Sequence, residues 1–250
     1  MSNKRLIIDI GNTAIELAVF ENEKLVEFIG FFQLKSQINE LKLALQNCKN
    51  NGLSVSEGMI FSVVPKYNLV VSKLIKKYFG FSIKVFDWKN YKLEKKDPRI
   101  TEAIGADLLA DIKSGEVLGG TCLIADCGTI TKLLLLDEKS NFVGLSLLPG
   151  VEVLTKLFKT NTALLPGSEC IKTTHNFGLN TIDSMNHGVL SATVSYIKNA
   201  FKSIDDKDKK LVITGGNLRF IRDEFKDAII DNDFTLKGMN ILFGEVSKWN

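Results

Sequence analysis

Residues 6–13 read LIIDIGNT, and residues 123–129 read LIADCGT. In each copy an apolar run reaches Asp-x-Gly, and a polar turn then leads to a second apolar run. Self-similarity of this kind is the sequence sign of a repeated structural unit. Asp9 and Asp126 lie 117 positions apart in a chain of 250 residues, so the repeat divides the chain into two similar halves.

The pattern around each copy predicts a three-strand meander followed by helix, strand and helix. In the first half we expect further strands at 15–20, 26–32 and 58–64 and helices at 36–50 and 67–79. In the second half we expect strands at 133–137, 142–148 and 211–214 and helices at 181–202 and 218–230. The prediction is two mixed α/β domains, 1–115 and 116–250, with an active-site cleft between them.

Composition narrows the classes of function. The chain has 32 Lys and Arg against 29 Asp and Glu, so its net charge of +3 gives no reason to expect nucleic acid or a membrane as partner. Four cysteines without a CxxC pair, together with two histidines, support neither a zinc site nor a disulfide framework. No apolar run is long enough to span a bilayer and no signal peptide is recognisable, so we expect a cytoplasmic protein with small-molecule partners.

The first hairpin has the residues of a phosphate loop. Gly11 lacks a Cβ where the chain turns, which lets the backbone N–H groups of Gly11, Asn12 and Thr13 approach phosphate oxygens. Asp9 can hold Mg²⁺ directly or through water. A plain hairpin is the alternative, because Asn and Gly are turn formers, but the recurrence at Asp126 favours a ligand loop.

The second hairpin repeats this chemistry with two hydroxyl groups. Asp126 can hold a cation, and Thr129 and Thr131 can both face phosphate. Pro149-Gly150 and Thr214-Gly215-Gly216 each follow a strand, where backbone can approach a ligand, although each is also an ordinary turn. Neither a P-loop nor a Rossmann glycine pattern is present.

Residues 101–112 read as a helix with Thr101 as N-cap and one apolar face. Asp107 and Asp111 share the other side, which on its own indicates a solvated face. The functional interpretation is that Asp107 orients an acceptor hydroxyl and takes its proton during phosphoryl transfer. In the long helix at 181–202, Asn180 is the expected N-cap and Asp183 stands three residues on, in the capping-box position.

Taken in order, these motifs resemble the type III pantothenate kinases over nearly the whole chain. The matching motifs are DIGNT at 9–13, GAD at 105–107, DCGT at 126–129, LPG at 148–150, ALLP at 163–166, NT at 180–181 and TGG at 214–216. The resemblance implies a duplicated actin-like (ribonuclease H-like) fold, a homodimer, ATP as phosphate donor, Mg²⁺, and a monovalent cation, K⁺ or NH₄⁺. The implied reaction is phosphorylation of pantothenate to 4′-phosphopantothenate, the first step of coenzyme A biosynthesis.

The resemblance also assigns roles to single positions. It makes Asp107 the catalytic proton acceptor and Asp126 the ligand of the monovalent cation. The implied ATP-binding residues are Asp9, Ile10, Gly11, Asn12, Thr13, Ala14, Ile15, Glu16 and Thr129. The implied substrate-binding residues are Gly105, Ala106, Asp107, Leu108 and Thr181, the last reaching the substrate of the neighbouring subunit.

The chain departs from the family pattern at several positions. Leu108 stands where the family usually has an Arg that helps to hold the pantothenate carboxylate; Arg99, Lys92, Lys95 and Lys96 are candidate substitutes. Lys132 stands where a Thr is common, Leu145 replaces a glycine, and Tyr91 lies further from Gly105 than the family's Tyr does.

Three functions are therefore open at this point. The first is pantothenate phosphorylation. The second is an actin-like kinase for another small alcohol, which the missing Arg permits. The third is a non-catalytic regulatory homologue that binds ATP or pantothenate, against which the retained Asp107 argues.

Overall fold

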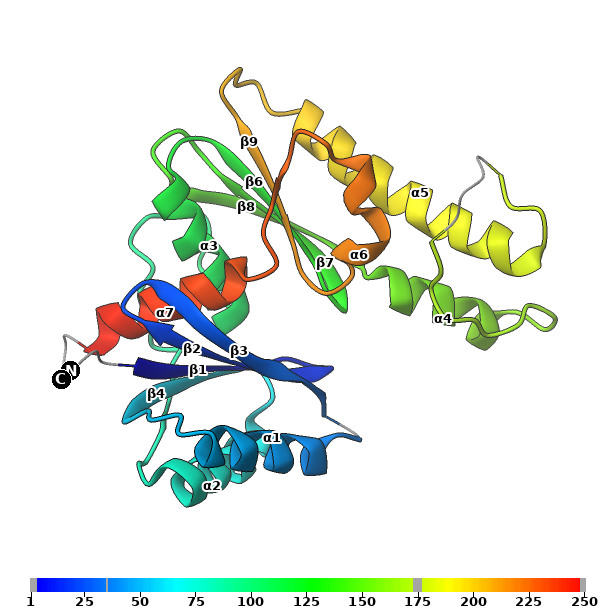
Figure 1. Cartoon of the computed structure of the whole chain (residues 1–250). Coiled ribbons are helices and arrows are strands. Elements are labelled where there is room, and N and C mark those ends of the chain that lie inside the picture. Colours follow the sequence, from blue (N-terminus) through cyan, green and yellow to red (C-terminus); the bar gives the residue numbers. More distant parts are fainter. Residues whose placement is uncertain (1–3, 35, 173–176, 248–250) are drawn as a thin grey trace. The chain divides into compact units, whose positions relative to one another are not determined.

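The computed structural model describes residues 4–34, 36–172 and 177–247. The chain divides into two compact units. One comprises Met1–Glu94, Thr101–Ser114 and Phe234–Asn250, and the other comprises Lys95–Ile100 and Gly115–Asp233. Each unit contains a five-stranded mixed sheet with flanking helices (Figure 1), as the duplicated α/β pattern predicts.

The first sheet has the strand order β3-β2-β1-β4-β5. Its strands are β1 (Lys4–Ile10), β2 (Ala14–Glu21), β3 (Lys24–Gln33), β4 (Glu57–Ser62) and β5 (Lys84–Val85). β1, β2 and β3 form the antiparallel meander, whereas β4 runs parallel to β1 and β5 parallel to β4. The carboxyl ends of β1 and β4 therefore meet at one edge, where α/β sheets commonly bind ligands.

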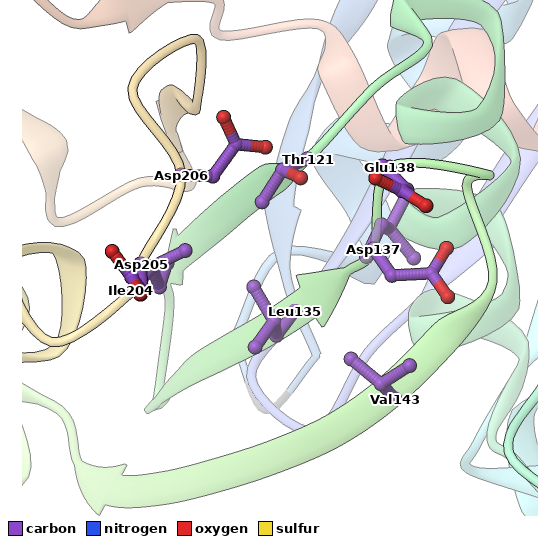
Figure 2. A pocket seen from close by; sticks show the side chains of 9 residues that line it. Thr121, Leu135, Asp137, Glu138, Val143, Ile204, Asp205 and Asp206 are labelled. Carbon is purple, nitrogen blue, oxygen red and sulfur yellow. The ribbon is translucent and has the colours of Figure 1, made fainter.

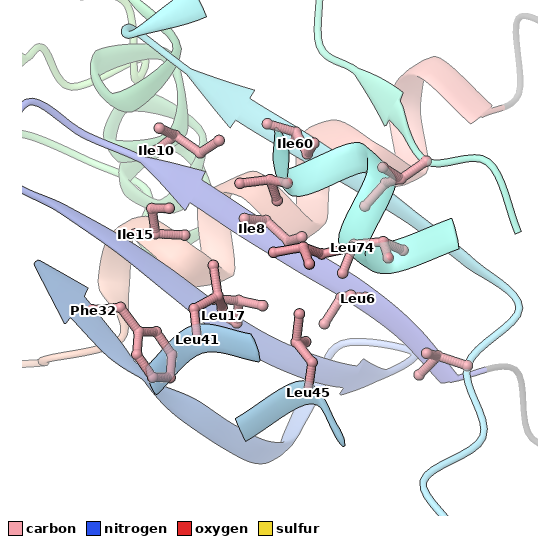
Figure 3. Packing of buried hydrophobic residues seen from close by; sticks show 14 of the residues in the cluster. Leu6, Ile8, Ile10, Ile15, Leu17, Phe32, Leu41, Leu45, Ile60 and Leu74 are labelled. Atoms are coloured by element: carbon pink, nitrogen blue, oxygen red, sulfur yellow. The ribbon is translucent and has the colours of Figure 1, made fainter. Parts of the chain in front are cut away.

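One face of the first sheet packs on α1 (Ile38–Asn50) and α2 (Asn68–Phe79). Alternate strand residues such as Leu6, Ile8 and Ile10 point into this core, as the period of two in a strand requires. They meet Leu41 and Leu45 of α1 (Figure 3). The residues of β1 that alternate with these, including Asp9, face away from this core.

The second sheet has the strand order β10-β9-β6-β7-β8, which is the first sheet's order repeated. Its strands are β6 (Cys122–Cys127), β7 (Ile130–Leu136), β8 (Phe142–Pro149), β9 (Lys210–Thr214) and β10 (Ile229–Ile230). The core of this unit includes residues of α4 (Val151–Asn161), α5 (Thr181–Lys202) and α6 (Leu218–Ile221). The Asn180 side chain caps α5 by accepting a hydrogen bond from the Asp183 N–H at 2.9 Å, as predicted.

Two predicted helices have different bounds in the structure. α3 covers Ala106–Leu118, so it begins after Gly105 and not at Thr101. The Gly105 carbonyl accepts the Leu109 N–H at 2.9 Å, which gives this glycine the N-cap role. The helix predicted at 218–230 ends at Ile221 and continues only as a 3₁₀ turn, Arg222–Glu224, because Ile229 and Ile230 become extended to pair with β9.

The C-terminal helix α7 (Phe234–Ser247) belongs to the first unit and packs against β1 and β4. A Cβ at Gly238 would lie 1.8 Å from the Ala110 carbonyl oxygen, so α7 and α3 touch at backbone distance. The last helix thus lies in the same compact unit as the N-terminal residues, although it follows the predicted boundary between 115 and 116. In the described part of the chain no helix is long and apolar enough to cross a membrane.

Candidate active site

The first hairpin is held by backbone hydrogen bonds on both sides. The Gly11 N–H donates to the Ala14 carbonyl at 3.0 Å and closes the turn. The Leu34 N–H donates to the Thr13 carbonyl at 3.0 Å, and the Val63 N–H donates to the Ile10 carbonyl at 3.1 Å. Asn12 and Thr13 at the tip are exposed. The turn is thus fixed while its tip is open to a ligand.

The side chains of this hairpin separate into two groups. Ile10, Ala14 and Ile15 are buried in the core, so only their backbone atoms are available to a ligand. Asp9 and Glu16 are half-buried and lie directly opposite each other on β1 and β2. Like charges directly opposite in a sheet repel, and a divalent cation would relieve that repulsion. Two facing carboxylates are also the kind of donor set that holds Mg²⁺ together with substrate phosphates.

Asp107 lies in the first turn of α3, in the same unit as the first hairpin. Its Oδ1 accepts the Leu108 N–H at 3.0 Å. A Cβ on Gly105 would come within 2.9 Å of this oxygen and 3.9 Å of Val63, whose N–H bonds Ile10. Gly105 therefore leaves room for the Asp107 carboxylate. Its proximity to Val63, which bonds Ile10, places it near the end of β1.

Asp111, one turn further along α3, does not lie on a solvated face. It is buried, and its Oδ1 accepts a hydrogen bond from the Thr235 hydroxyl of α7 at 2.7 Å. The solvated-face interpretation is wrong for this residue because α7 covers it. The two carboxylates of α3 thus have different environments, one partly open and one enclosed.

In the second hairpin, Asp126 lies directly opposite Lys132 on β7. The Lys132 ammonium forms an ion pair with Asp126 Oδ2, and the two side chains are only 13% and 10% exposed. Burial, followed by the nearby Asp126 carboxylate, raises the pKa of the Cys127 thiol well above its ordinary range. The hairpin therefore combines a paired, nearly buried carboxylate with an unreactive thiol.

Two glycine turns brace this second hairpin. The Gly150 N–H donates to the Thr129 carbonyl at 2.9 Å, and a Cβ on Gly150 would lie 2.1 Å from the Gly128 oxygen. Asn217 bonds the loop twice, from its N–H to the Cys127 carbonyl at 2.8 Å and from Nδ2 to the Gly128 carbonyl at 2.8 Å. The glycine of the LPG motif and Asn217, which directly follows the TGG motif, thus both bond the second loop. Both turns were predicted from the sequence, but the role of Asn217 was not.

The two threonines of the second loop differ. Thr129 is exposed. Thr131 is completely buried, so the expectation that it also faces phosphate is wrong. Thr131 lies within β7 on the face opposite Lys132, because neighbouring residues of a strand point to opposite faces, whereas Thr129 precedes the strand.

Comparison with known proteins identifies the family. A family model described as type III pantothenate kinase matches residues 5–203. The chain belongs to the type III pantothenate kinase family. A relative named type III pantothenate kinase from Dehalococcoides mccartyi is 27% identical, covering 97% of this chain and 98% of its own length. One from Halalkalibacterium halodurans is 28% identical, covering 95% and 98%.

Solved structures agree on the fold. A conserved Baf family protein from Campylobacter jejuni covers 97% of this chain and 99% of its own, with a TM-score of 0.62 at 20% identity. The activator of the 2-hydroxyisocaproyl-CoA dehydratase from Clostridium difficile, with bound ADPNP, covers 99% and 96%, with a TM-score of 0.52 at 12% identity. These likenesses, together with the repeated sheet order, establish the duplicated actin-like fold of this type III pantothenate kinase family member.

The residues suggested as substitutes for the family Arg have partners of their own in two cases. Arg99 forms a two-point ion pair with Asp97, Nε to Oδ1 at 2.9 Å and Nη2 to Oδ2 at 2.6 Å. Lys96 donates to the Ile100 carbonyl. Lys92 and Lys95 are exposed. Leu108 itself is half-buried at the start of α3.

Tyr91, which lies further from Gly105 than the family's Tyr does, makes its contacts within the first unit. Its hydroxyl donates to Glu245 Oε2 of α7 at 2.6 Å, and its ring packs on Phe86. Glu245 Oε1 also pairs with Lys113 at 3.1 Å. Burial and the bond to Glu245 raise the pKa of Tyr91 to about 12. Tyr91 thus serves to join α7 to the sheet.

A hollow of about 530 Å³ in the second unit does not coincide with the motif residues. It lies at the far end of β6 from Asp126, next to Thr121 (Figure 2). Its polar lining is mostly acidic, from Asp137, Glu138, Asp205 and Asp206. Such a lining repels phosphate, so we do not assign ATP to it. Among the described residues no cluster of three or more His, Cys, Asp or Glu suits a protein-held metal.

Proposed function

We propose that this chain transfers the γ-phosphoryl group of ATP to pantothenate, giving 4′-phosphopantothenate in the first step of coenzyme A biosynthesis, in the cytoplasm. The observation that carries the proposal is the family match over residues 5–203, which includes Asp9, Asp107 and Asp126 at the family's motif positions. The environments of these three carboxylates support a distinct role for each.

For ATP, we assign the backbone of the first hairpin, Asp9 to Glu16, and the exposed Thr129 of the second. The fixed turn with an exposed tip at Asn12 and Thr13 supports this, because backbone N–H groups bind phosphate best where no side chain intervenes. Asn217 and Gly150 fix the second loop through hydrogen bonds to its backbone carbonyl groups.

For Mg²⁺, Asp9 and Glu16 are the residues that fit. They face each other across β1 and β2, and Mg²⁺ is usually bound by one or two carboxylates plus phosphates and water. Bound Mg²⁺ would supply neutralisation of the phosphate charge. The resemblance also implies a monovalent cation at Asp126. Unlike Asp9, Asp126 already has a positive partner, because the Lys132 ammonium lies against its carboxylate.

For the chemistry, Asp107 positions the primary hydroxyl of pantothenate and accepts its proton. The hydroxyl oxygen forms a bond to the γ-phosphorus as the bond from that phosphorus to the β-phosphate oxygen breaks, and ADP leaves. The transition state is loose, so the base takes the proton late and needs position more than strength. Gly105 supports this role by leaving space beside Asp107 Oδ1.

For pantothenate itself, we assign Gly105, Ala106, Asp107 and Leu108. Leu108 cannot pair with the carboxylate of the substrate, so we expect weak binding of that group. A charge-assisted hydrogen bond is worth about 1.5–3 kcal/mol, so Leu108→Arg should lower KM for pantothenate by about tenfold or more with little change in kcat. An unchanged KM would show that another group already holds the carboxylate.

We further propose a homodimer in which Thr181 contacts the substrate of the neighbouring subunit. Thr181 is exposed at the start of α5, shortly after Phe177 and Leu179, which are 80% and 77% exposed. Leu164 is 93% exposed in the same unit. Large apolar side chains left in water favour a protein interface. Light scattering across a dilution series, with Phe177→Ser as the disruptive variant, tests this; a monomer that keeps full activity would contradict it.

The test of the main function is ATP consumption by purified protein with Mg²⁺, with and without pantothenate, and identification of the product by mass. We expect consumption to depend on pantothenate and phosphopantothenate to appear. ATP binding without product would favour another acceptor or the regulatory alternative.

Asp107→Asn distinguishes a kinase from a non-catalytic homologue. Loss of a general base typically costs 10²–10⁴ in rate, so we expect kcat to fall by roughly that factor while ATP affinity is retained. A matched control is Asp205→Asn, which removes a carboxylate from the acidic hollow of the second unit. Equal losses in both variants would contradict a specific role for Asp107.

A further inference from the structure

The second hairpin contains its own cation. Asp126 and Lys132 are direct cross-strand partners, and the Lys132 ammonium is ion-paired with Asp126 Oδ2. Both side chains are nearly buried, at 10% and 13% exposure, so the pair is poorly screened by water. A buried carboxylate needs one positive charge nearby, and a residue of the chain provides it.

The other side of the carboxylate is closed by backbone. Gly215 has φ +91°, and a Cβ there would lie 2.5 Å from Asp126 Oδ1 and 2.7 Å from the Cys127 backbone. A Cβ on Gly128 would lie 3.8 Å from the same oxygen. Thr214 is in register with Asp126 on β9 and is 1% exposed. Asp126 is therefore enclosed by Gly128, Gly215 and Thr214, with the ammonium at Oδ2.

A second cation at this carboxylate is electrostatically unfavourable. Two unit positive charges about 4 Å apart in a partly buried site repel strongly enough to weaken K⁺ binding by roughly a hundredfold or more. The residues present thus do not fit a separate monovalent cation at Asp126. They fit the same charge supplied by a side chain.

We propose that the Lys132 ammonium takes the place of the monovalent cation at Asp126, so that this kinase binds ATP and turns over without K⁺ or NH₄⁺. The inference rests on the proposed function, since it concerns the cation of the same ATP site. Lys132 is a positioning residue here: it fixes the Asp126 carboxylate and neutralises its charge.

A purely structural ion pair makes a different prediction. In that case removal of Lys132 would lower stability equally in all salts, and K⁺ would have no special effect on ATP binding. In our proposal Lys132→Thr removes the internal cation, leaves a carboxylate and a hydroxyl, and creates a site that K⁺ can fill. The readout is therefore a response to K⁺ that the wild-type protein lacks.

The experiment measures Mg-ATP binding by calorimetry without pantothenate, so it does not depend on turnover. Tetramethylammonium, which is too large for the site, is replaced stepwise by K⁺ up to about 100 mM at constant ionic strength. For the wild type we expect Kd to change by less than about twofold. A wild-type Kd that improves tenfold in K⁺ would overturn the proposal.

For Lys132→Thr we expect at least about tenfold weaker binding in tetramethylammonium, largely restored by K⁺ or NH₄⁺. K⁺ should also raise the melting temperature of this variant in the absence of ATP, by several degrees. Lys139→Thr, an exposed lysine in a turn of the same unit, is the control and should behave as wild type. A loss that K⁺ does not restore would contradict the proposal.

Lys132→Thr leaves Asp126 without its partner and is at risk of not folding. The double variant Asp126→Asn/Lys132→Thr removes both charges and should fold without any response to K⁺; a response would overturn the assignment of the cation to Asp126. The wild-type titration tests the proposal without any variant, because a Kd that depends on K⁺ would overturn it. The response of Lys132→Thr to K⁺ then distinguishes the proposal from a purely structural ion pair. Cation-independent ATP binding with no phosphopantothenate in any salt would instead contradict the proposed function.

Discussion

The two Asp-x-Gly hairpins occupy equivalent places in their sheets but have opposite charges across from the aspartate. In the first sheet Asp9 faces Glu16, and in the second Asp126 faces Lys132. Across β3-β2-β1-β4 the residues in register are Phe31, Glu16, Asp9 and Phe61. Across β8-β7-β6-β9 the corresponding residues are Leu147, Lys132, Asp126 and Thr214. One backbone plan thus supports two electrostatic solutions.

This difference in charge predicts whether each hairpin requires an added cation. Two facing carboxylates are stabilised by an added divalent cation, whereas a carboxylate that faces an ammonium is already neutralised. The hairpins also differ in how they are held. The first is fixed by strand-like hydrogen bonds from Leu34 and Val63, and the second by close glycine turns at Gly150 and Gly215.

The largest expected effect breaks the bracing of the second hairpin. In Gly150→Ala the new methyl would lie 2.1 Å from the Gly128 oxygen and 2.7 Å from the Thr129 oxygen. Backbone must move, and we expect a loss of about 3 kcal/mol in the free energy of unfolding. Thermal and urea denaturation measure it. The control is Gly144→Ala, which has nothing within 4 Å of the added methyl.

The first hairpin should tolerate the corresponding change. A methyl at Gly11 would come no closer than 3.7 Å to the Ala14 carbonyl, so Gly11→Ala should change stability by less than about 1 kcal/mol. If Gly11→Ala destabilised the protein as much as Gly150→Ala, the contrast in bracing would be wrong.

An intermediate effect comes from giving the first hairpin the charge arrangement of the second. Glu16→Lys places an ammonium opposite Asp9, as Lys132 lies opposite Asp126. We expect the Mg²⁺ concentration for half-maximal activity to rise by about tenfold or more, because the cation meets a neutralised carboxylate. Glu23→Lys, an exposed site in the same unit with the same change in charge, should leave the Mg²⁺ requirement unchanged.

An unchanged Mg²⁺ requirement in Glu16→Lys would show that Glu16 does not bind the metal, and Asp9 would remain the assigned ligand. In either case the replacement of a like-charge pair by an opposite-charge pair should add about 0.2–1 kcal/mol of stability. The two readouts therefore test ligand binding and sheet pairing independently.

The smallest effect concerns a titratable contact of the first unit. The pKa of Tyr91 is raised from 10.0 to about 12, so its contribution to stability is complete below pH 10 and is lost as the pH rises toward 12. Because Tyr91 is only half-buried, we expect about 1 kcal/mol rather than the full value. Urea denaturation at about pH 9 and 11 should show a smaller alkaline loss for Tyr91→Phe than for the wild type. Tyr78→Phe on α2 is the control.

Local pattern made much of this structure predictable from the sequence. The repeated hairpins, the meanders and the capped start of α5 follow from residues a few positions apart. Register would also have paired Lys132 with Asp126, because a tight turn between two antiparallel strands fixes which residues face each other. That pairing was within reach of the sequence and was missed.

Contacts between distant segments were not predictable. Asp111 reads as a surface residue until α7 covers it, and its partner Thr235 is 124 positions away. The short α6 depends on pairing of Ile229 with Val212 of β9. The start of α3 depends on Gly105, which the sequence reading placed inside the helix. For Asp111 and α6, tertiary contacts outweigh local propensity, whereas the start of α3 is set locally by the Gly105 cap.

The place of α7 in the first unit has a consequence for synthesis. Chains emerge from the ribosome N-terminus first, and domains generally fold as units as they emerge. The second unit is complete once Asp233 has been made, whereas the first still lacks the helix that covers Asp111 and packs on Ala110. The unit that is begun first is therefore finished last, and a chain truncated after Asp233 would contain every segment of the second unit but lack α7 of the first.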